Sequence, residues 1–358
     1  QHVNFSTMFA FYIFCSFRHS LFFMSTRLLE IEYLSVHFHT PEGVALALDG
    51  VSFHLAAGET IGLVGESGCG KSVTSLSILG LIPSPPGRIE SGKIMFSRQN
   101  LLDLDHERLR QIRGRQISMI FQEPMTSLNP VLPIGRQVAE PLMIHQGLSK
   151  TEAFEKAADW LDYVKIPAAA KRLNDYPHQL SGGMRQRVMI AMAMVCGPEL
   201  LIADEPTTAL DVTIQAQILS LMNRLKAELA MSMLLITHDL GVVAQMAARV
   251  VVMYAGQVVE EASVTDIFDR PFHPYTQGLL KSIPPPGGRL KSRIKRLSEI
   301  PGTVPVLTDI VVGCKFAERC LHTFDLCLER QPELLRIREG HRARCWLKEH
   351  PERRRDNV

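Results

Sequence analysis

Short apolar runs recur along the first part of the chain, and polar or glycine-rich residues follow each of them. Four of these runs are almost wholly apolar, as are strands that a parallel sheet buries on both faces. They lie at residues 61–64, 117–121, 200–203 and 233–236. Segments of helical length separate the runs, so we predict βαβ units and a mostly parallel core sheet.

Other stretches depart from this pattern. Residues 34–38 alternate between apolar and polar as a half-buried strand does, and a turn signal and a second strand at 51–55 follow. Residues 135–195 contain no strand-like run and carry apolar residues at helical spacing, which predicts an inserted helical subdomain. Ala255 and Gly256 separate two apolar runs and predict a hairpin at the end of the first domain.

Changes in composition suggest the domain limits. We predict a first domain over residues 24–265, a C-terminal extension over 266–350 and a tail over 351–358, because prolines and cysteines gather beyond residue 265. Residues 1–23 carry an apolar run shorter than the ~20 residues of a membrane helix, without the basic start or cleavage site of a signal peptide. We predict a non-native or disordered extension there, with an interfacial membrane anchor as the alternative.

Composition narrows the function classes. The 358 residues are 46% hydrophobic, enough to bury a core, and their formal net charge is +2 with both signs interspersed. Nucleic-acid-binding proteins need a concentrated basic field, so we predict no nucleic-acid partner. Seven cysteines in a chain of this length do not indicate a secreted disulfide framework.

The first candidate chemistry follows the apolar run at 61–64, where an eight-residue phosphate-loop pattern opens a helix. Glycines let backbone N–H groups turn toward phosphates, and the helix N-terminus adds partial positive charge. We expect Lys71 to bind the β- and γ-phosphates of a nucleotide and Ser72 to bind Mg²⁺. The predicted nucleotide-binding loop consists of Gly65, Glu66, Ser67, Gly68, Cys69, Gly70, Lys71 and Ser72.

A pair of carboxylates, Asp204 and Glu205, follows the buried run at 200–203. At the end of a strand, Asp204 is placed to reach the metal through water, and Glu205 is placed to polarise an attacking water. Two adjacent carboxylates can also be an ordinary strand end. The phosphate loop that precedes the pair in the sequence favours the interpretation that both carboxylates belong to a nucleotide site.

Residues 180–187 read Leu-Ser-Gly-Gly-Met-Arg-Gln-Arg and resemble the signature of ABC-transporter ATPases, with Met184 where the commonest version has Gln. The order and spacing of the other elements are similar to that family over roughly residues 28–265. The resemblance implies an α/β P-loop domain with a mostly parallel core sheet, an antiparallel β subdomain and a helical subdomain. It also implies ATP and Mg²⁺ as cofactors.

The resemblance assigns roles to single residues. Glu205, His238 and Gln122 resemble the hydrolytic residues, and Gln122 also the residue that binds the metal and touches the membrane subunit. Phe38 resembles the aromatic that stacks on adenine. The remaining nucleotide-binding positions implied by the resemblance are Ser181, Gly182 and Gly183 of the signature and Asp211 of the loop between the two ATP sites.

In this family a second ATPase subunit packs head to tail, and its signature closes on the γ-phosphate. One copy of each motif in this chain therefore implies a second homologous ATPase subunit and a heterodimer. The resemblance further implies two transmembrane permease subunits and an external substrate-binding protein. It places the chain peripherally on the cytoplasmic face of a bacterial inner membrane.

Residues 270–276, Arg-Pro-Phe-His-Pro-Tyr-Thr, closely resemble the start of the C-terminal extension in dipeptide and oligopeptide importer ATPases. We expect structural roles for His273 and Tyr275, in turn formation and packing. The resemblance implies that ATP hydrolysis energises peptide uptake. The alternatives are a nickel or glutathione importer, a non-transport ABC ATPase, and a metal- or redox-sensing module.

Four cysteines of the extension form a separate candidate site. Structural zinc sites usually use pairs about two to four residues apart, and these cysteines are more widely spaced. Thiolates from loops also hold [4Fe–4S] clusters, which accompany a similar pattern in the resembled subfamily. A [4Fe–4S] cluster is therefore our first interpretation, with zinc and ordinary or redox-paired thiols as alternatives. The residues are Cys314, Cys320, Cys327 and Cys345.

Overall fold

A computed structural model of the chain describes residues 27–122, 127–208, 210–283, 299–305, 308 and 311–355. The predicted N-terminal extension over 1–23 lies outside these ranges, as does the end of the predicted tail. Among the helices of the described ranges, none is both long enough and apolar enough to cross a bilayer.

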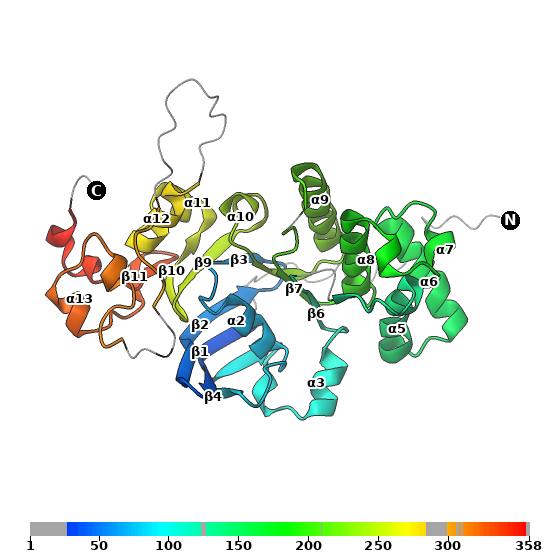
Figure 1. Cartoon of the computed structure of the whole chain (residues 1–358), viewed down its shortest axis with the longest axis horizontal. Helices are drawn as coiled ribbons and strands as arrows, with labels where there is room; N and C mark the ends of the chain where they lie inside the picture. The colour runs from blue at the N-terminus through cyan, green and yellow to red at the C-terminus, as the bar shows by residue number, and fades with distance from the viewer. Residues whose placement is uncertain are drawn as a thin grey trace, which may run out of the picture.

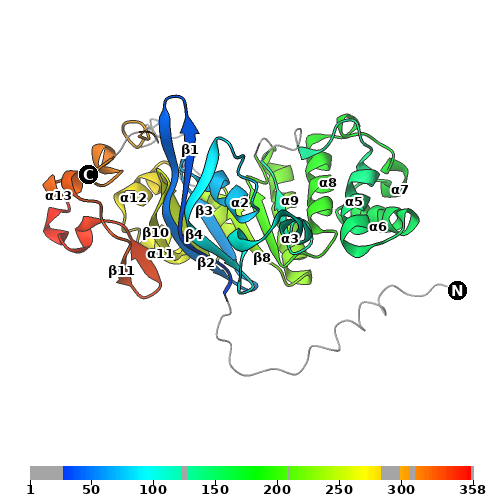
Figure 2. The ribbon, with the colours of Figure 1, turned by 90° about the horizontal axis from the view of Figure 1, so that it is seen from below.

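Two sheets form the centre of the described part, with a group of helices at one end and the C-terminal extension at the other (Figures 1 and 2). The smaller sheet has the strand order β2-β1-β4-β5, and the larger has the order β11-β12-β10-β9-β3-β8-β7-β6. The strands are β1 (Arg27–Thr40), β2 (Gly43–Ala56), β3 (Thr60–Val64), β4 (Gly87–Phe96), β5 (Gln99–Asn100), β6 (Ile117–Ile120), β7 (Leu200–Asp204), β8 (Ser232–Ile236), β9 (Arg249–Tyr254), β10 (Gln257–Ser263), β11 (Leu335–Arg338) and β12 (His341–Ala343).

The described α-helices cover the larger sheet and build the helical end. They are α2 (Lys71–Ile78), α3 (His106–Ile112), α5 (Ile134–Gln146), α6 (Lys150–Tyr163), α7 (Ala169–Arg172), α8 (Gly182–Met194), α9 (Val212–Glu228), α10 (Leu240–Met246), α11 (Val264–Asp269), α12 (Pro274–Lys281) and α13 (Asp325–Glu329). The smaller sheet is antiparallel throughout, and its β1–β2 hairpin contains both strands expected near the start of the domain.

The strands β9, β3, β8, β7 and β6 pair in parallel, which confirms the predicted core. Successive residues of β7 and β8 face opposite sides of the sheet. Leu201 and Met233 pack in the core that includes α8 and α9, whereas Leu200 and Leu234 pack in the core shared with the antiparallel sheet. Burial on both faces explains why these strands read as continuous apolar runs.

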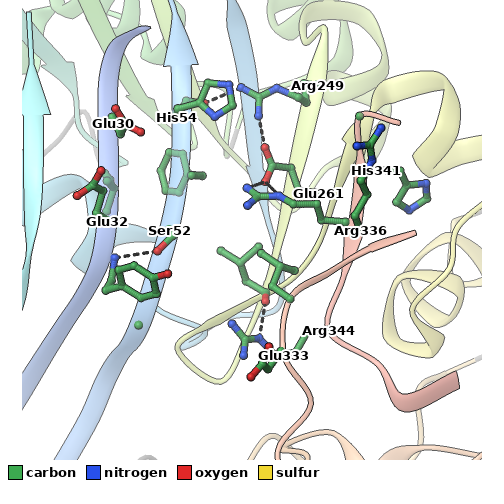
Figure 3. Close-up of a pocket in the computed structure, with 18 of the residues that line it drawn as sticks. Glu30, Glu32, Ser52, His54, Arg249, Glu261, Glu333, Arg336, His341 and Arg344 are labelled. Atoms are coloured by element: carbon green, nitrogen blue, oxygen red, sulfur yellow. Dashed lines mark hydrogen bonds and ion pairs between the residues drawn. The ribbon is translucent and has the colours of Figure 1, made fainter. Parts of the chain in front are cut away.

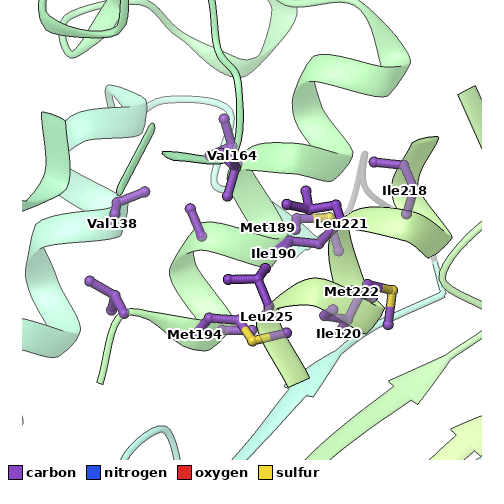
Figure 4. Close-up of a cluster of buried hydrophobic side chains, with 14 of the residues drawn as sticks. Ile120, Val138, Val164, Met189, Ile190, Met194, Ile218, Leu221, Met222 and Leu225 are labelled. Carbon is purple, nitrogen blue, oxygen red and sulfur yellow. The ribbon is translucent and has the colours of Figure 1, made fainter. Parts of the chain in front are cut away.

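Helices α5 to α8 follow β6 and precede β7, as the absence of strand patterns in that stretch predicts. Figure 4 shows how they join the sheet: Val138 of α5, Ile190 of α8 and Leu225 of α9 meet in one apolar cluster. All three side chains are completely buried. Packing of this cluster sets the orientation of α8, the helix that starts with the predicted signature.

The C-terminal extension continues the larger sheet beyond the β9–β10 hairpin. Strand β12 pairs antiparallel with β10, and β11 forms the sheet edge. Glu261 of β10 forms ion pairs with both Arg249 of β9 and Arg342 of β12, beside a large cleft that separates this part of the sheet from β2 (Figure 3). The sheet thus crosses the boundary predicted near residue 265, and that boundary stays a prediction.

Candidate functional site

Four parallel strands end at the same edge of the larger sheet, and each is followed by predicted site residues. The phosphate loop follows β3, Gln122 follows β6, Asp204 ends β7 with Glu205 directly after it, and His238 follows β8. In open α/β sheets, ligands bind in the crevice outside the carboxyl ends of the strands. The strand order therefore places the predicted chemistry where such a ligand would lie.

The phosphate loop has a backbone that only glycine accommodates at two of its turns. Gly65 and Gly70 have φ angles of 155° and 102°. A Cβ atom at Gly65 would lie 2.3 Å from the carbonyl oxygen of Met253, and one at Gly70 would lie 2.8 Å from that of Ala47. The neighbouring backbone thus holds the loop tightly against the β9–β10 and β1–β2 hairpins.

The ammonium group of Lys71 rests on the backbone of its own loop. It donates to the carbonyl oxygens of Gly65 at 2.8 Å and Glu66 at 3.0 Å, and the side chain is buried. These acceptors are neutral, so the positive charge is left to pair with a phosphate. Burial raises the pKa of the neighbouring Cys69 thiol, which favours the backbone role expected for that residue.

Asp204 and Ser72 meet at the start of α2. The Ser72 hydroxyl is hydrogen-bonded to the Asp204 carboxylate, whose side chain is buried at the end of β7. Burial raises the pKa of Asp204, and the neighbouring charge of Glu205 adds to this effect. A hydroxyl and a carboxylate oxygen side by side are the hard donors that Mg²⁺ prefers, so this pair fits the predicted metal.

Three side chains converge on Glu205. One carboxylate oxygen lies 3.0 Å from Nδ1 of His238, and the other accepts from Gln122 Nε2 at 3.2 Å and from Thr208 Oγ1 at 2.9 Å. The structure thus brings the three predicted hydrolytic residues together. It adds Thr208, which follows closely in the sequence but carries no motif signal of its own.

The backbone and charge of Glu205 are also unusual. Its φ of 47° lies in the left-handed region that non-glycine residues rarely adopt, and its N–H donates to the Ile236 carbonyl at 2.8 Å. Burial alone would raise the pKa of Glu205. Hydrogen bonds from His238 and Thr208, with the charge of Lys71, outweigh burial and lower this pKa below its usual value. The carboxylate is therefore ionised at neutral pH.

Residues of the signature form the start of a helix of their own, α8. Ser181 caps α8 by accepting from the Met184 N–H at 3.4 Å, and Gly182 and Gly183 are the first residues of that helix. Asp211 caps α9 in the same way. Figures 1 and 2 place α8 among the helices at one end of the molecule, apart from α2. The structure therefore does not bring the signature to the phosphate loop of its own chain.

The remaining predicted binding residue, Phe38, lies on β1. It is half-buried and packs beside the core of the antiparallel sheet. A Cβ atom at Gly87 would lie 2.9 Å from its ring, so a glycine leaves room for the aromatic there. Its predicted contact with adenine stays a prediction.

Sequence reasoning missed two residues that touch the phosphate loop. The Tyr275 hydroxyl accepts the backbone N–H of Glu66 at 2.9 Å, and the Arg319 guanidinium pairs with the Glu66 carboxylate at 2.7 Å. Tyr275 was expected to pack, which it does, but it also holds the loop. One signal was available: an acidic side chain beside a phosphate site calls for a cation nearby.

The four cysteines of the extension line one small cavity. They are free thiols, and burial raises the pKa of Cys314 and of Cys345 to about 12. Backbone N–H groups point at the sulfurs, as in the 3.4 Å contact from His322 to Cys320. Four sulfurs with such donors fit an iron–sulfur group chemically. Within the described ranges, however, no three Cys, His, Asp or Glu side chains are arranged to hold a metal ion.

Comparisons with known proteins identify the family of the chain. Residues 48–208 match the family model for the ABC transporter, and residues 259–327 match that for the oligopeptide/dipeptide transporter, C-terminal region. A structure titled as the dimeric post-hydrolysis state of the ATP-binding cassette MJ0796, bound to ADP and Pi, has a TM-score of 0.59 and 29% identity. It covers 66% of this chain and 98% of that chain.

Relatives match over nearly the whole chain. The probable peptide ABC transporter ATP-binding protein y4tR of Sinorhizobium fredii is 55% identical, over 89% of this chain and 94% of that protein. The oligopeptide transport ATP-binding protein AppD of Bacillus subtilis is 52% identical, over 91% of this chain and 98% of that protein. The chain therefore belongs to the family of peptide ABC transporter ATP-binding proteins.

Proposed function

We propose that this chain hydrolyses ATP at the carboxyl edge of its parallel sheet and that the reaction powers peptide uptake through a membrane complex. The observation that carries the proposal is the convergence of Gln122, Thr208 and His238 on an ionised Glu205, beside a phosphate loop. A carboxylate held this way is ready to accept a proton from an attacking water.

Each residue then has a defined task. The loop N–H groups and Lys71 bind the β- and γ-phosphates, while Ser72 and Asp204 would hold Mg²⁺, which supplies charge neutralisation on the phosphate oxygens when bound. Glu205 orients a water in line with the bond between the γ-phosphate and the leaving ADP, and it accepts the proton of that water as the water attacks. His238 and Gln122 keep the carboxylate in place through their contacts with its two oxygens.

The second half of the ATP site comes from a partner. Ser181 and Gly183 stand at the N-terminus of α8, where helix N–H groups and partial positive charge favour an anion, but apart from their own phosphate loop. We propose a homologous ATPase subunit that packs head to tail, so that each signature closes on the other subunit's γ-phosphate. The similar cassette MJ0796 is titled as a dimer, which supports this arrangement.

Peptide cargo follows from the relatives and from the matched C-terminal region. The chain would sit peripherally on the cytoplasmic face of a bacterial inner membrane, against two permease subunits that receive peptide from an external binding protein. A groove on the helical end, between α5 and α6, offers a docking place. Phe121, which directly precedes Gln122, and Val131 are exposed and offer further apolar surface for docking.

Replacing Glu205 by Gln tests the chemical part of the proposal. The amide keeps the size and most hydrogen bonds but cannot accept a proton, so we expect hydrolysis to fall by about a hundredfold or more. ATP binding should persist, because the phosphate loop is unchanged. Phosphate release and nucleotide affinity, measured on the complex with its partner, check both statements.

The control is the substitution Glu199→Gln. Glu199 is an acidic residue directly before β7, at the opposite end of that strand from Glu205. The hydrolysis rate of this variant should equal that of the native protein. Near-normal hydrolysis by the Glu205→Gln variant would show that another group activates water.

We further propose that Cys314, Cys320, Cys327 and Cys345 hold a [4Fe–4S] cluster, which would organise the end of the extension and supply a redox-active group when bound. Their shared cavity and the N–H donors aimed at sulfur support the proposal. Raised thiol pKa values mean that four thiolates are stable together only beside a cation. Protein purified without oxygen should contain about four irons and absorb visible light; a colourless, iron-free, folded protein would exclude the cluster.

A further inference from the structure

The C-terminal extension returns to the ATP site at one residue of the phosphate loop, Glu66. The guanidinium of Arg319 donates from Nη1 to Glu66 Oε2 at 2.7 Å and from Nη2 to Oε1 at 3.0 Å. Two parallel bonds between a guanidinium and a carboxylate form the strongest common ion-pair geometry in proteins. The Arg319 side chain is only 5% exposed and the Glu66 side chain 30%, so the pair is partly shielded from solvent on the arginine side.

Arg319 is itself held in place before it reaches the loop. Its Nε donates to the Pro301 carbonyl at 2.9 Å, and the guanidinium lies 5.7 Å from the ring centre of Tyr254 and 6.0 Å from that of Phe316. These contacts fix the orientation of the donor fork. Little conformational freedom is then lost when the fork binds a carboxylate.

A second residue of the extension grips the backbone of Glu66. The Tyr275 hydroxyl accepts the Glu66 N–H at 2.9 Å, and its fully buried ring packs 4.7 Å from the ring of Tyr254 and 5.4 Å from that of Phe316. One aromatic cluster therefore supports both Tyr275 and Arg319. The side chain and the main chain of Glu66 are held from the same direction.

The position of Glu66 in turn affects Lys71, the lysine expected to bind phosphate. Its carbonyl oxygen accepts from the Lys71 ammonium at 3.0 Å, next to the matching bond from Gly65. A shift of Glu66 would move the resting position of Lys71. The Glu66 carboxylate would also repel a nucleotide triphosphate if its charge were not paired.

We infer that Arg319 is a positioning residue of the ATP site: by pairing with Glu66 it neutralises the one acidic side chain of the phosphate loop and fixes the backbone on which Lys71 rests. The extension is then part of the nucleotide-binding apparatus, although none of its residues needs to touch ATP. The inference rests on the proposed function only in taking Mg-ATP as the ligand.

Arg319→Met tests this role in the assembled transporter, because Met keeps apolar bulk against the rings and removes the charge. We expect the KM for Mg-ATP to rise about tenfold while kcat stays within about twofold, the pattern of lost ground-state binding. Adding Glu66→Gln to this variant removes the unpaired carboxylate and should bring KM most of the way back to the native value. Arg319→Lys, which keeps the charge but not the fork, should fall between the native protein and Arg319→Met.

Arg342→Met is the matched control, since Arg342 also lies in the extension and pairs with a carboxylate, that of Glu261 in β10. Its KM should equal that of the native protein. An unchanged KM for Arg319→Met, or an equal rise in both variants, would overturn the inference. If Arg319→Met does not fold, a KM within about threefold of the native value in the Glu66→Gln and Arg319→Met double variant supports the inference, and a KM about tenfold or more above the native value contradicts it. Native protein that hydrolyses no ATP would instead refute the proposed function.

Discussion

Glu205 combines three features that single residues seldom share. It adopts a left-handed backbone, it is mostly buried, and both of its carboxylate oxygens have side-chain partners. The backbone bond to Ile236 holds it between the ends of β7 and β8. Strained backbone persists only where the surroundings enforce it. The contacts around Glu205 therefore fix its conformation, and the geometry of β7 alone does not.

His238 controls the charge of this carboxylate. Among the groups that lower the pKa of Glu205, the hydrogen bond from His238 comes first, while burial works in the opposite direction. In His238→Ala the opposing effect of burial is less compensated, so this pKa should rise. The acidic limb of the kcat profile against pH, where the base becomes protonated, should therefore move to higher pH.

Thr208→Val is the comparison, since it removes a weaker contribution to the same carboxylate and should move the limb less, in the same direction. A limb that stays at the native pH in the His238→Ala variant would mean that Glu205 is not the group that titrates.

At the scale of elements, α8 links the signature to β7, the strand that Glu205 follows. Gln186 of α8 donates to the Pro206 carbonyl at 2.6 Å, just beyond Glu205, and the helix is buried against α9 and the sheet. The signature and the hydrolytic residues are therefore attached to one packed unit. If a partner subunit displaced α8, the hydrogen bond from Gln186 would transmit the displacement to Pro206 and so to the end of β7.

This packing makes α8 sensitive to truncation. Ile190 is fully buried, so Ile190→Ala should lower the free energy of unfolding by about 2–5 kcal/mol through lost apolar contact and a cavity. Ile144→Ala on α5, where the side chain is 57% exposed, should change it by no more than about 0.5 kcal/mol. Urea unfolding of both variants measures the difference. Equal effects would mean that the cluster of Figure 4 is not the packed core described.

The sequence predicts elements better than it predicts contacts between distant segments. Continuous apolar runs mark β3, β7 and β8 because these strands are buried on both faces, and the glycine pattern marks the loop after β3. The ion pair of Arg319 with Glu66 joins residues 253 positions apart. No local pattern encodes such a pairing, because it depends on how the extension folds back across the sheet.

At the scale of the whole molecule, the two motifs proposed to enclose ATP lie on different parts of the chain. The phosphate loop and Glu205 share an edge of the sheet, whereas the signature opens α8, which lies between the sheet and helices α5 to α7 (Figures 1 and 2). Under the proposed function, one subunit alone would leave the terminal phosphate open on the side that the signature is proposed to close. Closure by a second subunit would convert ATP binding into a movement that the helical end passes to the permeases.

The most direct measurement is the ATPase rate of the purified chain with and without its partner ATPase and permease subunits. We predict that the lone chain binds Mg-ATP but hydrolyses it about a hundredfold more slowly than the assembled complex, because the signature donors are missing from its site. Analytical ultracentrifugation at the protein concentration of each assay would show whether the purified chain is a monomer. A lone monomer that turns over ATP at the rate of the complex would contradict the account.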